Sequence, residues 1–229
     1  DEILALLKGK PIQRMHRVAL VLCGLFIGLA MLLLPLAGNH PEWLMDKIQD
    51  TFARQNLEAS VHWPWFTYIP GIIWFAGILF FLIPAFKNNP GRKFAVLFGA
   101  NLLAGLLFLI WMPWRIASYT QMAAVDFYKS MQGKDVYVET LGFKSYAQYF
   151  YSDKQSISAQ EKQNSLDSEG NYHIDNLRDW LLKGNIDKPA YFVVKSIHED
   201  QYLEPFHLQC VGRKNGFSFL LRPVPPQAD

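Results

Sequence analysis

Three long runs without a charged residue occupy most of the first half of this chain. They cover residues 18–37, 65–86 and 94–114. A helix of about 20 apolar residues is long enough to cross the hydrocarbon core of a bilayer. Buried helices of a soluble protein are the alternative, but three such runs so close together favour a membrane protein. We therefore expect three transmembrane helices.

The charges that flank these runs predict how the chain crosses the membrane. Basic residues are concentrated before the first run and in the short loop 87–93, whereas the loop 38–64 carries more acidic than basic residues. Positive charge marks the cytoplasmic side of a membrane protein. We therefore expect the N-terminal side in the cytoplasm, and residues 38–64 and everything after residue 117 outside it.

The sequence divides into two parts of different character. Residues 1–117 form the expected transmembrane region, and residues 118–229 form a polar segment long enough to bury one core. The net charge of the chain is only +2, which gives no case for nucleic-acid binding. The fold class is thus an all-α membrane part followed by a small α/β domain outside the cytoplasm.

The outer loop carries a helical pattern over about residues 41–57. Apolar residues recur there at spacings of three and four, which predicts an amphipathic helix lying at the outer membrane interface. Its acidic residues Glu42, Asp46 and Asp50 could act as catalytic acids. A solvated helix face explains them more simply.

The pattern after residue 117 predicts a mixed α/β domain. A helix that continues from the third span is expected to end over 126–131, and 152–170 is expected to be a mobile surface insertion. The expected strands cover 135–140, 190–196, 206–211 and 217–221, and the expected helices cover 143–151 and 175–183.

Several kinds of chemistry have no motif in this sequence. It contains no phosphate-binding glycine loop, no dinucleotide fingerprint and no nucleophile elbow, which argues against a self-contained soluble hydrolase or kinase. The six histidines lack the spacing of a metal site, so we expect no metal and no cofactor. Cys23 in a span and Cys210 in the outer domain are too far apart for a disulfide.

Arg115 is the most informative single charge, because it directly follows Trp114 at the outer end of the third run. A guanidinium group at this boundary can bind a lipid phosphate through two parallel hydrogen bonds. An anchoring side chain that extends to the interface is the alternative.

A second candidate site lies at the expected turn from the first strand into the next helix. Glu139 ends the strand, and Lys144 and Tyr146 begin the helix. Ligands often bind at such a turn in α/β layers. The alternative is a surface pair of Glu139 and Lys144 beside tyrosines that pack on the sheet.

The segment Val136–Lys154, VYVETLGFKSYAQYFYSDK, adds a resemblance to a known family. A strand followed by a helix bearing Ser145 and Tyr146, and then Phe150 and Tyr151, is similar to the start of the periplasmic domain in bacterial GT-C membrane glycosyltransferases. The family is that of the protein O-mannosyltransferases and aminoarabinose transferases, and the chain resembles its C-terminal region.

The resemblance implies a GT-C fold in the bacterial inner membrane and a sugar donor carried on a polyprenyl phosphate. The sugar would pass to a lipid or protein acceptor on the periplasmic face. In this family the catalytic carboxylate lies in the first outer loop near the N-terminus of the protein, so no catalytic residue is assigned to this segment. The expected partners are the lipid-linked donor, membrane lipids and further N-terminal transmembrane helices of the same protein.

Four residues remain as candidates for binding substrate or lipid phosphate: Arg115, Glu139, Lys144 and Tyr146. An alternative function stays open, in which the chain is a non-catalytic, membrane-anchored module that binds a periplasmic partner.

Overall fold

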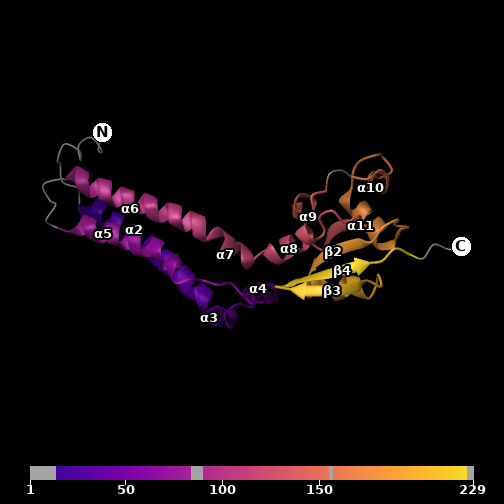
Figure 1. Cartoon of the computed structure of the whole chain (residues 1–229), viewed down its shortest axis with the longest axis horizontal. Helices are drawn as coiled ribbons and strands as arrows, with labels where there is room; N and C mark the ends of the chain where they lie inside the picture. Colours follow the sequence, from indigo (N-terminus) through magenta and orange to yellow (C-terminus); the bar gives the residue numbers. More distant parts are fainter. Residues whose placement is uncertain (1–13, 84–89, 155–156, 226–229) are drawn as a thin grey trace. The chain divides into compact units, whose positions relative to one another are not determined.

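The structure, a computed structural model, describes residues 14–83, 90–154 and 157–225 (Figure 1). The chain forms two compact units, which we describe separately. The first unit comprises residues up to Lys47 together with Ser60–Ile116. The second comprises Ile48–Ala59 together with the residues from Ala117 onward.

Three long helices make up the first unit: α2 (Arg14–Asn39), α5 (Ile69–Leu82) and α6 (Pro90–Trp111). The short helix η1 (Trp65–Tyr68) leads into α5, and α7 (Pro113–Ser118) follows α6. Three stretches are long and apolar enough to cross a membrane, namely Val18–Asn39, Trp65–Leu82 and Gly91–Ser118. The prediction of three helices long and apolar enough to cross a membrane is confirmed, except that residues 84–86 of the second run lie outside the described residues.

Close contact at glycine residues allows α5 to pack against both α2 and α6. The carbonyl of Gly24 accepts a hydrogen bond of 2.8 Å from Trp74 Nε1. A Cβ atom at Gly77 would lie only 2.7 Å from the Cβ of Ala100. Small residues are typical of helix contacts in membranes, where packing replaces the hydrophobic effect as the driving force.

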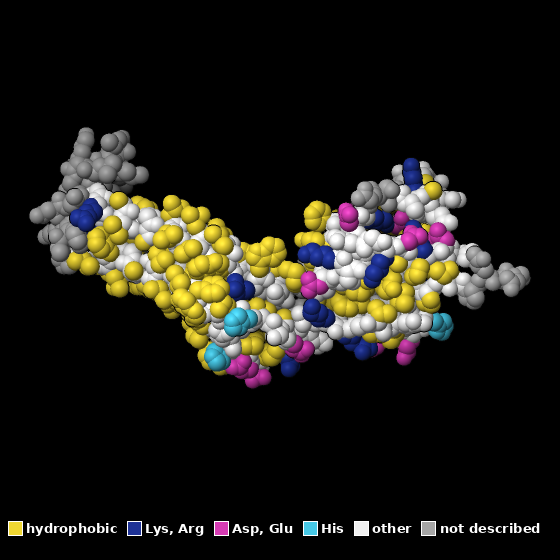
Figure 2. Space-filling view, viewed as in Figure 1, with side chains coloured by type: hydrophobic (Ala, Val, Ile, Leu, Met, Phe, Trp, Pro, Cys, Tyr) yellow, Lys and Arg dark blue, Asp and Glu magenta, His cyan; other side chains and the backbone are white. Residues whose placement is uncertain are grey.

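The outer surface of these helices is largely apolar (Figure 2). Phe26, Leu102 and Leu109 are each about two-thirds exposed or more, with exposed fractions of 75%, 66% and 67%. A water-soluble monomer rarely exposes so continuous an apolar surface, because its contact with water is unfavourable. The surface of the first unit is therefore suited to contact with lipid.

The segment between α2 and η1 differs from the single helix expected over 41–57. It contains two short helices, α3 (Glu42–Met45) and α4 (Thr51–Leu57). The carboxylate of Asp50 accepts a hydrogen bond of 3.0 Å from the backbone N–H of Ala53 and so caps the start of α4. This capping interaction starts a new helix, and α4 belongs to the second unit instead of continuing α3.

A four-stranded sheet forms the centre of the second unit. Its strands are β1 (Tyr137–Leu141), β2 (Ala190–Lys195), β3 (Gln209–Lys214) and β4 (Phe217–Arg222), in the order β1-β2-β4-β3. The pair β1–β2 is parallel, and the pairs β2–β4 and β3–β4 are antiparallel. The predicted mixed α/β domain is confirmed in this architecture.

Helices cover both faces of the sheet. Leu177 and Leu181 of α11 (Ile174–Lys183) pack with Phe192 on one face. Tyr128 of α8 (Met122–Ser130) packs with Val193 on the other face. Alternate residues of β2 thus point to opposite cores, as strand geometry requires.

The shorter helices of this unit lie in the connections between the larger elements. They are α9 (Ala147–Tyr151), α10 (Ala159–Asn164), η3 (Ser196–His198) and α12 (Asp200–Leu203).

Three expected elements differ in their extent. The third span does not continue as one helix to Met131, because α7 ends at Ser118 and α8 begins at Met122. The helix expected from residue 143 begins at Ala147. The strand expected from residue 206 begins at Gln209.

The segment 152–170, expected to be a mobile insertion, contains the helix α10. The hydroxyl of Ser158 accepts from the backbone N–H of Glu161, and the Glu161 carboxylate accepts from the backbone N–H of Ser158. This reciprocal capping satisfies two N–H groups at the start of the helix. Glu161 is also buried, so α10 is an integral part of the unit.

Candidate functional site

Arg115 lies in α7, directly after the break between α6 and α7. Its Nε atom donates a hydrogen bond of 3.2 Å to the carbonyl of His62, and Nη1 donates to the carbonyl of Trp111. The guanidinium carbon also lies 5.5 Å from the centre of the Phe66 ring. Trp111 is the last residue of α6, so Arg115 satisfies a carbonyl that has no partner within its own helix.

These contacts hold the Arg115 side chain in one orientation. Neither hydrogen bond uses Nη2, the nitrogen that can meet a further acceptor. The side chain is half-buried, which reduces the screening of its charge by water. Arg115 therefore combines a fixed guanidinium group with a position at the end of a helix able to cross a membrane.

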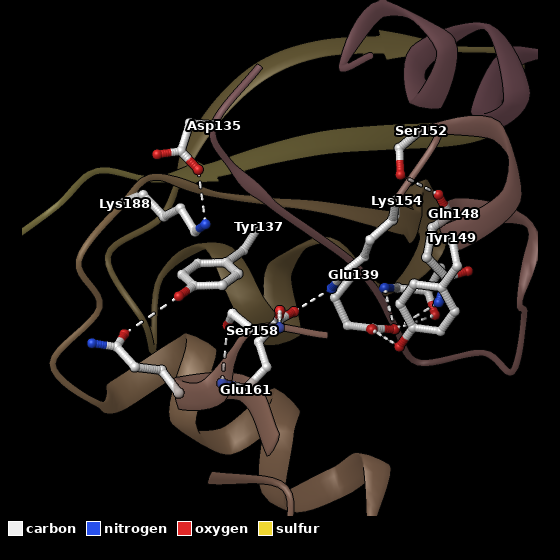
Figure 3. A network of polar contacts seen from close by, with 12 residues as sticks. Asp135, Tyr137, Glu139, Gln148, Tyr149, Ser152, Lys154, Ser158, Glu161 and Lys188 are labelled. Atoms are coloured by element: carbon white, nitrogen blue, oxygen red, sulfur yellow. Dashed lines mark hydrogen bonds and ion pairs between the residues drawn. The ribbon is translucent and has the colours of Figure 1, made fainter. Parts of the chain in front are cut away.

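Glu139 lies in β1 and is buried, with an exposed fraction of 1%. Its Oε1 atom accepts a hydrogen bond of 2.9 Å from Gln148 Nε2, and its Oε2 atom accepts one of 2.5 Å from the hydroxyl of Tyr149 (Figure 3). The backbone N–H of Thr140 donates to Oε1 at 2.9 Å, and Arg178 of α11 forms an ion pair with the same oxygen at 3.7 Å.

This environment makes Glu139 a structural carboxylate. Burial, reinforced by the negative charge of Glu139, raises the pKa of Tyr149, so the phenol keeps its proton and remains a hydrogen-bond donor. Both carboxylate oxygens are occupied and excluded from solvent. The expected surface pair of Glu139 with Lys144 is not present, because the cation beside Glu139 is Arg178.

Among the described residues, the partners of Glu139 do not include the other two candidates at this turn. Lys144 lines an apolar cavity that α4, α8 and the sheet surround. Tyr146 precedes the first turn of α9 and is 69% exposed. The structure therefore does not bring Glu139, Lys144 and Tyr146 together into one binding site.

A polar cluster near the start of β1 was not anticipated from the sequence. Lys154 pairs with Glu161 of α10 (Figure 3). The hydroxyl of Tyr137 donates a hydrogen bond of 2.7 Å to Asp187. Lys188 lies 4.8 Å from the centre of the Tyr137 ring.

The groups of this cluster border a polar cavity of about 380 Å³. Lys188 also pairs with Asp135 at 2.8 Å (Figure 3). The ion pair with Asp135 and the contact with the Tyr137 ring hold Lys188 within the protein. The lysines Lys154 and Lys188 are thus neutralised by acidic neighbours, which makes the cluster a link between α10 and β1. Among the described residues, no group of three or more His, Cys, Asp or Glu could hold a metal ion.

Comparisons with known proteins give two similar crystal structures. Both are of ArnT from Cupriavidus metallidurans, one bound to undecaprenyl phosphate and one in the apo state. They are 12% and 11% identical to this chain, with TM-scores of 0.48 and 0.43. The matches cover 90% and 94% of this chain but only 38% and 40% of the ArnT chain.

No family model matches the chain, and neither does any curated protein.

Proposed function

We propose that this chain is the C-terminal part of a membrane glycosyltransferase of the GT-C class. The enzyme transfers a sugar from a polyprenyl phosphate to a lipid or protein acceptor on the periplasmic face of the bacterial inner membrane. The observation that carries the proposal is the fixed guanidinium group of Arg115 at the end of a helix able to cross a membrane. The resemblance of Val136–Lys154 to this family supports the same function.

The chemistry of such a transfer favours a cation beside the departing phosphate. When an acceptor oxygen attacks the anomeric carbon, the bond to the phosphate oxygen breaks and negative charge collects on the departing lipid phosphate. A positioned guanidinium group stabilises that charge most strongly in the transition state. In this proposal Nη2 of Arg115 contacts the phosphate, while Nε and Nη1 hold the side chain to the protein.

The carboxylate that accepts the proton of the attacking hydroxyl is not assigned to this segment. Glu139 is unsuited to that role, because it is buried beneath its own hydrogen-bond partners. The proposal therefore assigns Arg115 to the binding of the donor and leaves the base to another part of the enzyme.

The test measures the binding of undecaprenyl phosphate and of undecaprenol to the full-length protein by native mass spectrometry. We expect the phosphate form to bind more tightly, and Arg115→Ala to weaken its binding by about tenfold or more, because a hydrogen bond between charged groups is lost. Binding of undecaprenol should not change. Arg115→Lys keeps the charge but loses the guanidinium fork, and should give an intermediate affinity.

Arg92→Ala is the matched control, because it removes the same charge from the opposite end of α6. It should bind both lipids as the unmodified protein does. Equal affinity for undecaprenyl phosphate and undecaprenol, or an Arg115→Ala variant that binds the phosphate normally, would remove the basis of the proposal. That result would favour a non-catalytic membrane-anchored module instead.

A further inference from the structure

A second cavity lies entirely within the second unit, away from every group discussed for sugar transfer. It has a volume of about 590 Å³, within the range of small-molecule binding sites. One wall is α4, a second is α8, and a third is the sheet face at Phe217. The segment that ends at Ala147 closes another side.

The wall of this cavity is mainly apolar, and all of its charged residues are positive. Phe52, Leu57 and Phe143 contribute apolar surface, while Lys144 and Lys195 contribute the charges. The lining contains no acidic residue. Among the described residues neither lysine forms an ion pair, and the ammonium group of Lys195 lies 4.7 Å from the centre of the Phe52 ring.

Two buried polar atoms at the cavity have no hydrogen-bond partner among the described residues. They are the hydroxyl oxygen of Tyr128 and the Oδ1 atom of Asn56. Tyr128 is 1% exposed and Asn56 is 6% exposed. The amide of Asn56 is oriented by its Nδ2 atom, which donates a hydrogen bond of 3.0 Å to the carbonyl of Phe52. Buried polar groups normally have partners, so both atoms are available to hydrogen-bond with a molecule bound in the cavity.

The Tyr128 hydroxyl is suited to an anionic ligand. Burial, followed in importance by the charge of Glu139, raises the pKa of Tyr128, so the phenol remains a hydrogen-bond donor. Together with the two lysine ammonium groups it offers donors to a ligand, and no acidic residue lines the cavity. An anion with an apolar chain matches both properties of the cavity.

We propose that this cavity binds a lipid with a single acyl chain and an anionic head group. The chain occupies the surface formed by Phe52, Leu57 and Phe143, and the head group binds Lys144 and Lys195. In the sequence, residues 119–121 of the cavity wall directly follow a stretch that ends at Ser118 and is long and apolar enough to cross a membrane, where such lipids occur.

The proposal is independent of the proposed function. The cavity belongs to the second unit and Arg115 to the first, so the two sites can be tested separately. Lys144, which the sequence suggested as a partner of lipid phosphate, takes part here in a different binding site.

The experiment measures ligand binding to the purified, delipidated full-length protein by native mass spectrometry. The probes are oleate, 1-oleoyl lysophosphatidate and the uncharged monoolein. We expect at least one anionic probe to bind more tightly than monoolein, and the comparison of oleate with lysophosphatidate identifies a carboxylate or a phosphate head group. The double variant Lys144→Ala/Lys195→Ala should weaken this binding by about tenfold or more.

Three further variants separate a binding site from a loss of folding. Ala53→Trp places a bulky side chain on the half-buried cavity wall at α4 and should block all acyl probes. Lys162→Ala removes an exposed lysine from α10 in the same unit and should have no effect. The double variant Lys144→Arg/Lys195→Arg keeps both charges and should restore binding.

Three results would overturn the proposal. They are equal binding of monoolein and the anionic probes, unchanged binding by the double alanine variant, and failure of all three probes to bind. Arg115→Ala should leave the binding of oleate and lysophosphatidate unchanged. Failure of this proposal can therefore be distinguished from failure of the proposed function, which the binding of undecaprenyl phosphate tests.

Discussion

Arg178 Nη2 lies 3.7 Å from Oε1 of Glu139, a residue with an exposed fraction of only 1%. The pair joins α11 to β1 across the edge of the sheet. The same Nη2 atom of Arg178 donates a hydrogen bond of 3.0 Å to the hydroxyl of Thr140. Because a carboxylate in this environment is costly to bury alone, the stability of the second unit depends on its cation.

Removing this cation should destabilise the second unit strongly. Arg178→Met leaves the Glu139 carboxylate buried without its partner, and we expect a loss of about 3 kcal/mol or more in the free energy of unfolding. Hydrogen exchange of peptides that span β1 measures this loss in the full-length protein.

The double variant Glu139→Gln/Arg178→Met should recover most of that loss, because neither charge of this pair then remains buried. Lys183→Met is the matched control, since it breaks an exposed pair with Asp179 and should change stability by less than about 1 kcal/mol. Our account of the buried pair fails if the double variant is no more stable than Arg178→Met.

Glu199 should give the second unit a stability that depends on pH. Arg213 donates two hydrogen bonds to its carboxylate, at 2.8 and 2.7 Å, and the hydroxyl of Ser218 donates a third at 2.7 Å. The hydrogen bond with Arg213, followed by that with Ser218, lowers the pKa of Glu199 below the ordinary value of 4.5.

A lowered pKa means that the folded state binds this proton less readily than the unfolded state. The contribution of Glu199 to stability is therefore fully present above pH 4.5 and is lost as the pH falls through the lower pKa of the folded state. Glu199→Gln should be less stable than the unmodified protein at pH 7, and the difference should shrink below pH 4.5. Unfolding curves at several pH values test this expectation, and a difference that stays constant down to pH 3 would contradict it.

The contact between α5 and α6 should tolerate no side chain at Gly77. A Cβ atom there would meet the Cβ of Ala100 at 2.7 Å, so Gly77→Val forces the helices apart at a cost of about 1–3 kcal/mol. The measurement is the thermal unfolding of the full-length protein in detergent.

Gly99→Val in α6 is the matched control, because no atom lies within 4 Å of a Cβ built at that residue. The control should unfold close to the temperature of the unmodified protein. Equal loss of stability in both variants would show that helix propensity matters here and the packing of α5 against α6 does not.

Local sequence patterns were sufficient to predict the long apolar helices and the strands of the sheet. The apolar runs were long enough to identify α2, α5 and α6, and the short apolar run in Ala190–Lys195 identified β2. Residues 215–216 between β3 and β4 carry the Asn-Gly pair typical of a hairpin turn, and Asn215 adopts a positive φ of 47° there.

These patterns did not predict which elements that are distant in the sequence pack against each other. The segment around Phe52 has the periodicity of an interfacial helix, but the Phe52 ring packs edge-on against Phe217 with the ring centres 5.3 Å apart. An apolar helix face does not say whether lipid or a protein core covers it. The assignment of α4 to the second unit therefore required the tertiary structure.

The sequence carries a signal for the buried ion pair of Glu139 and Arg178. Ile174, Leu177 and Leu181 repeat at helical spacing, and Arg178 falls on the same face of that helix. Glu139 likewise interrupts the apolar face that Tyr137 and Leu141 form in β1. Each of these two apolar faces carries one charged residue, and the two charges are opposite. Such a pattern predicts that the two residues form a buried pair.

The central claim is that the second unit lies outside the cytoplasm, on the face where the lipid-linked sugar is used. The most direct test is the labelling of single cysteines in spheroplasts by a membrane-impermeant maleimide, in the background Cys23→Ser/Cys210→Ser. Phe150→Cys reports on the second unit at a side chain that is 78% exposed. Arg92→Cys reports on the expected cytoplasmic side. We predict that residue 150 is labelled in intact spheroplasts and residue 92 only after lysis, whereas labelling of residue 92 but not of residue 150 before lysis would contradict the account.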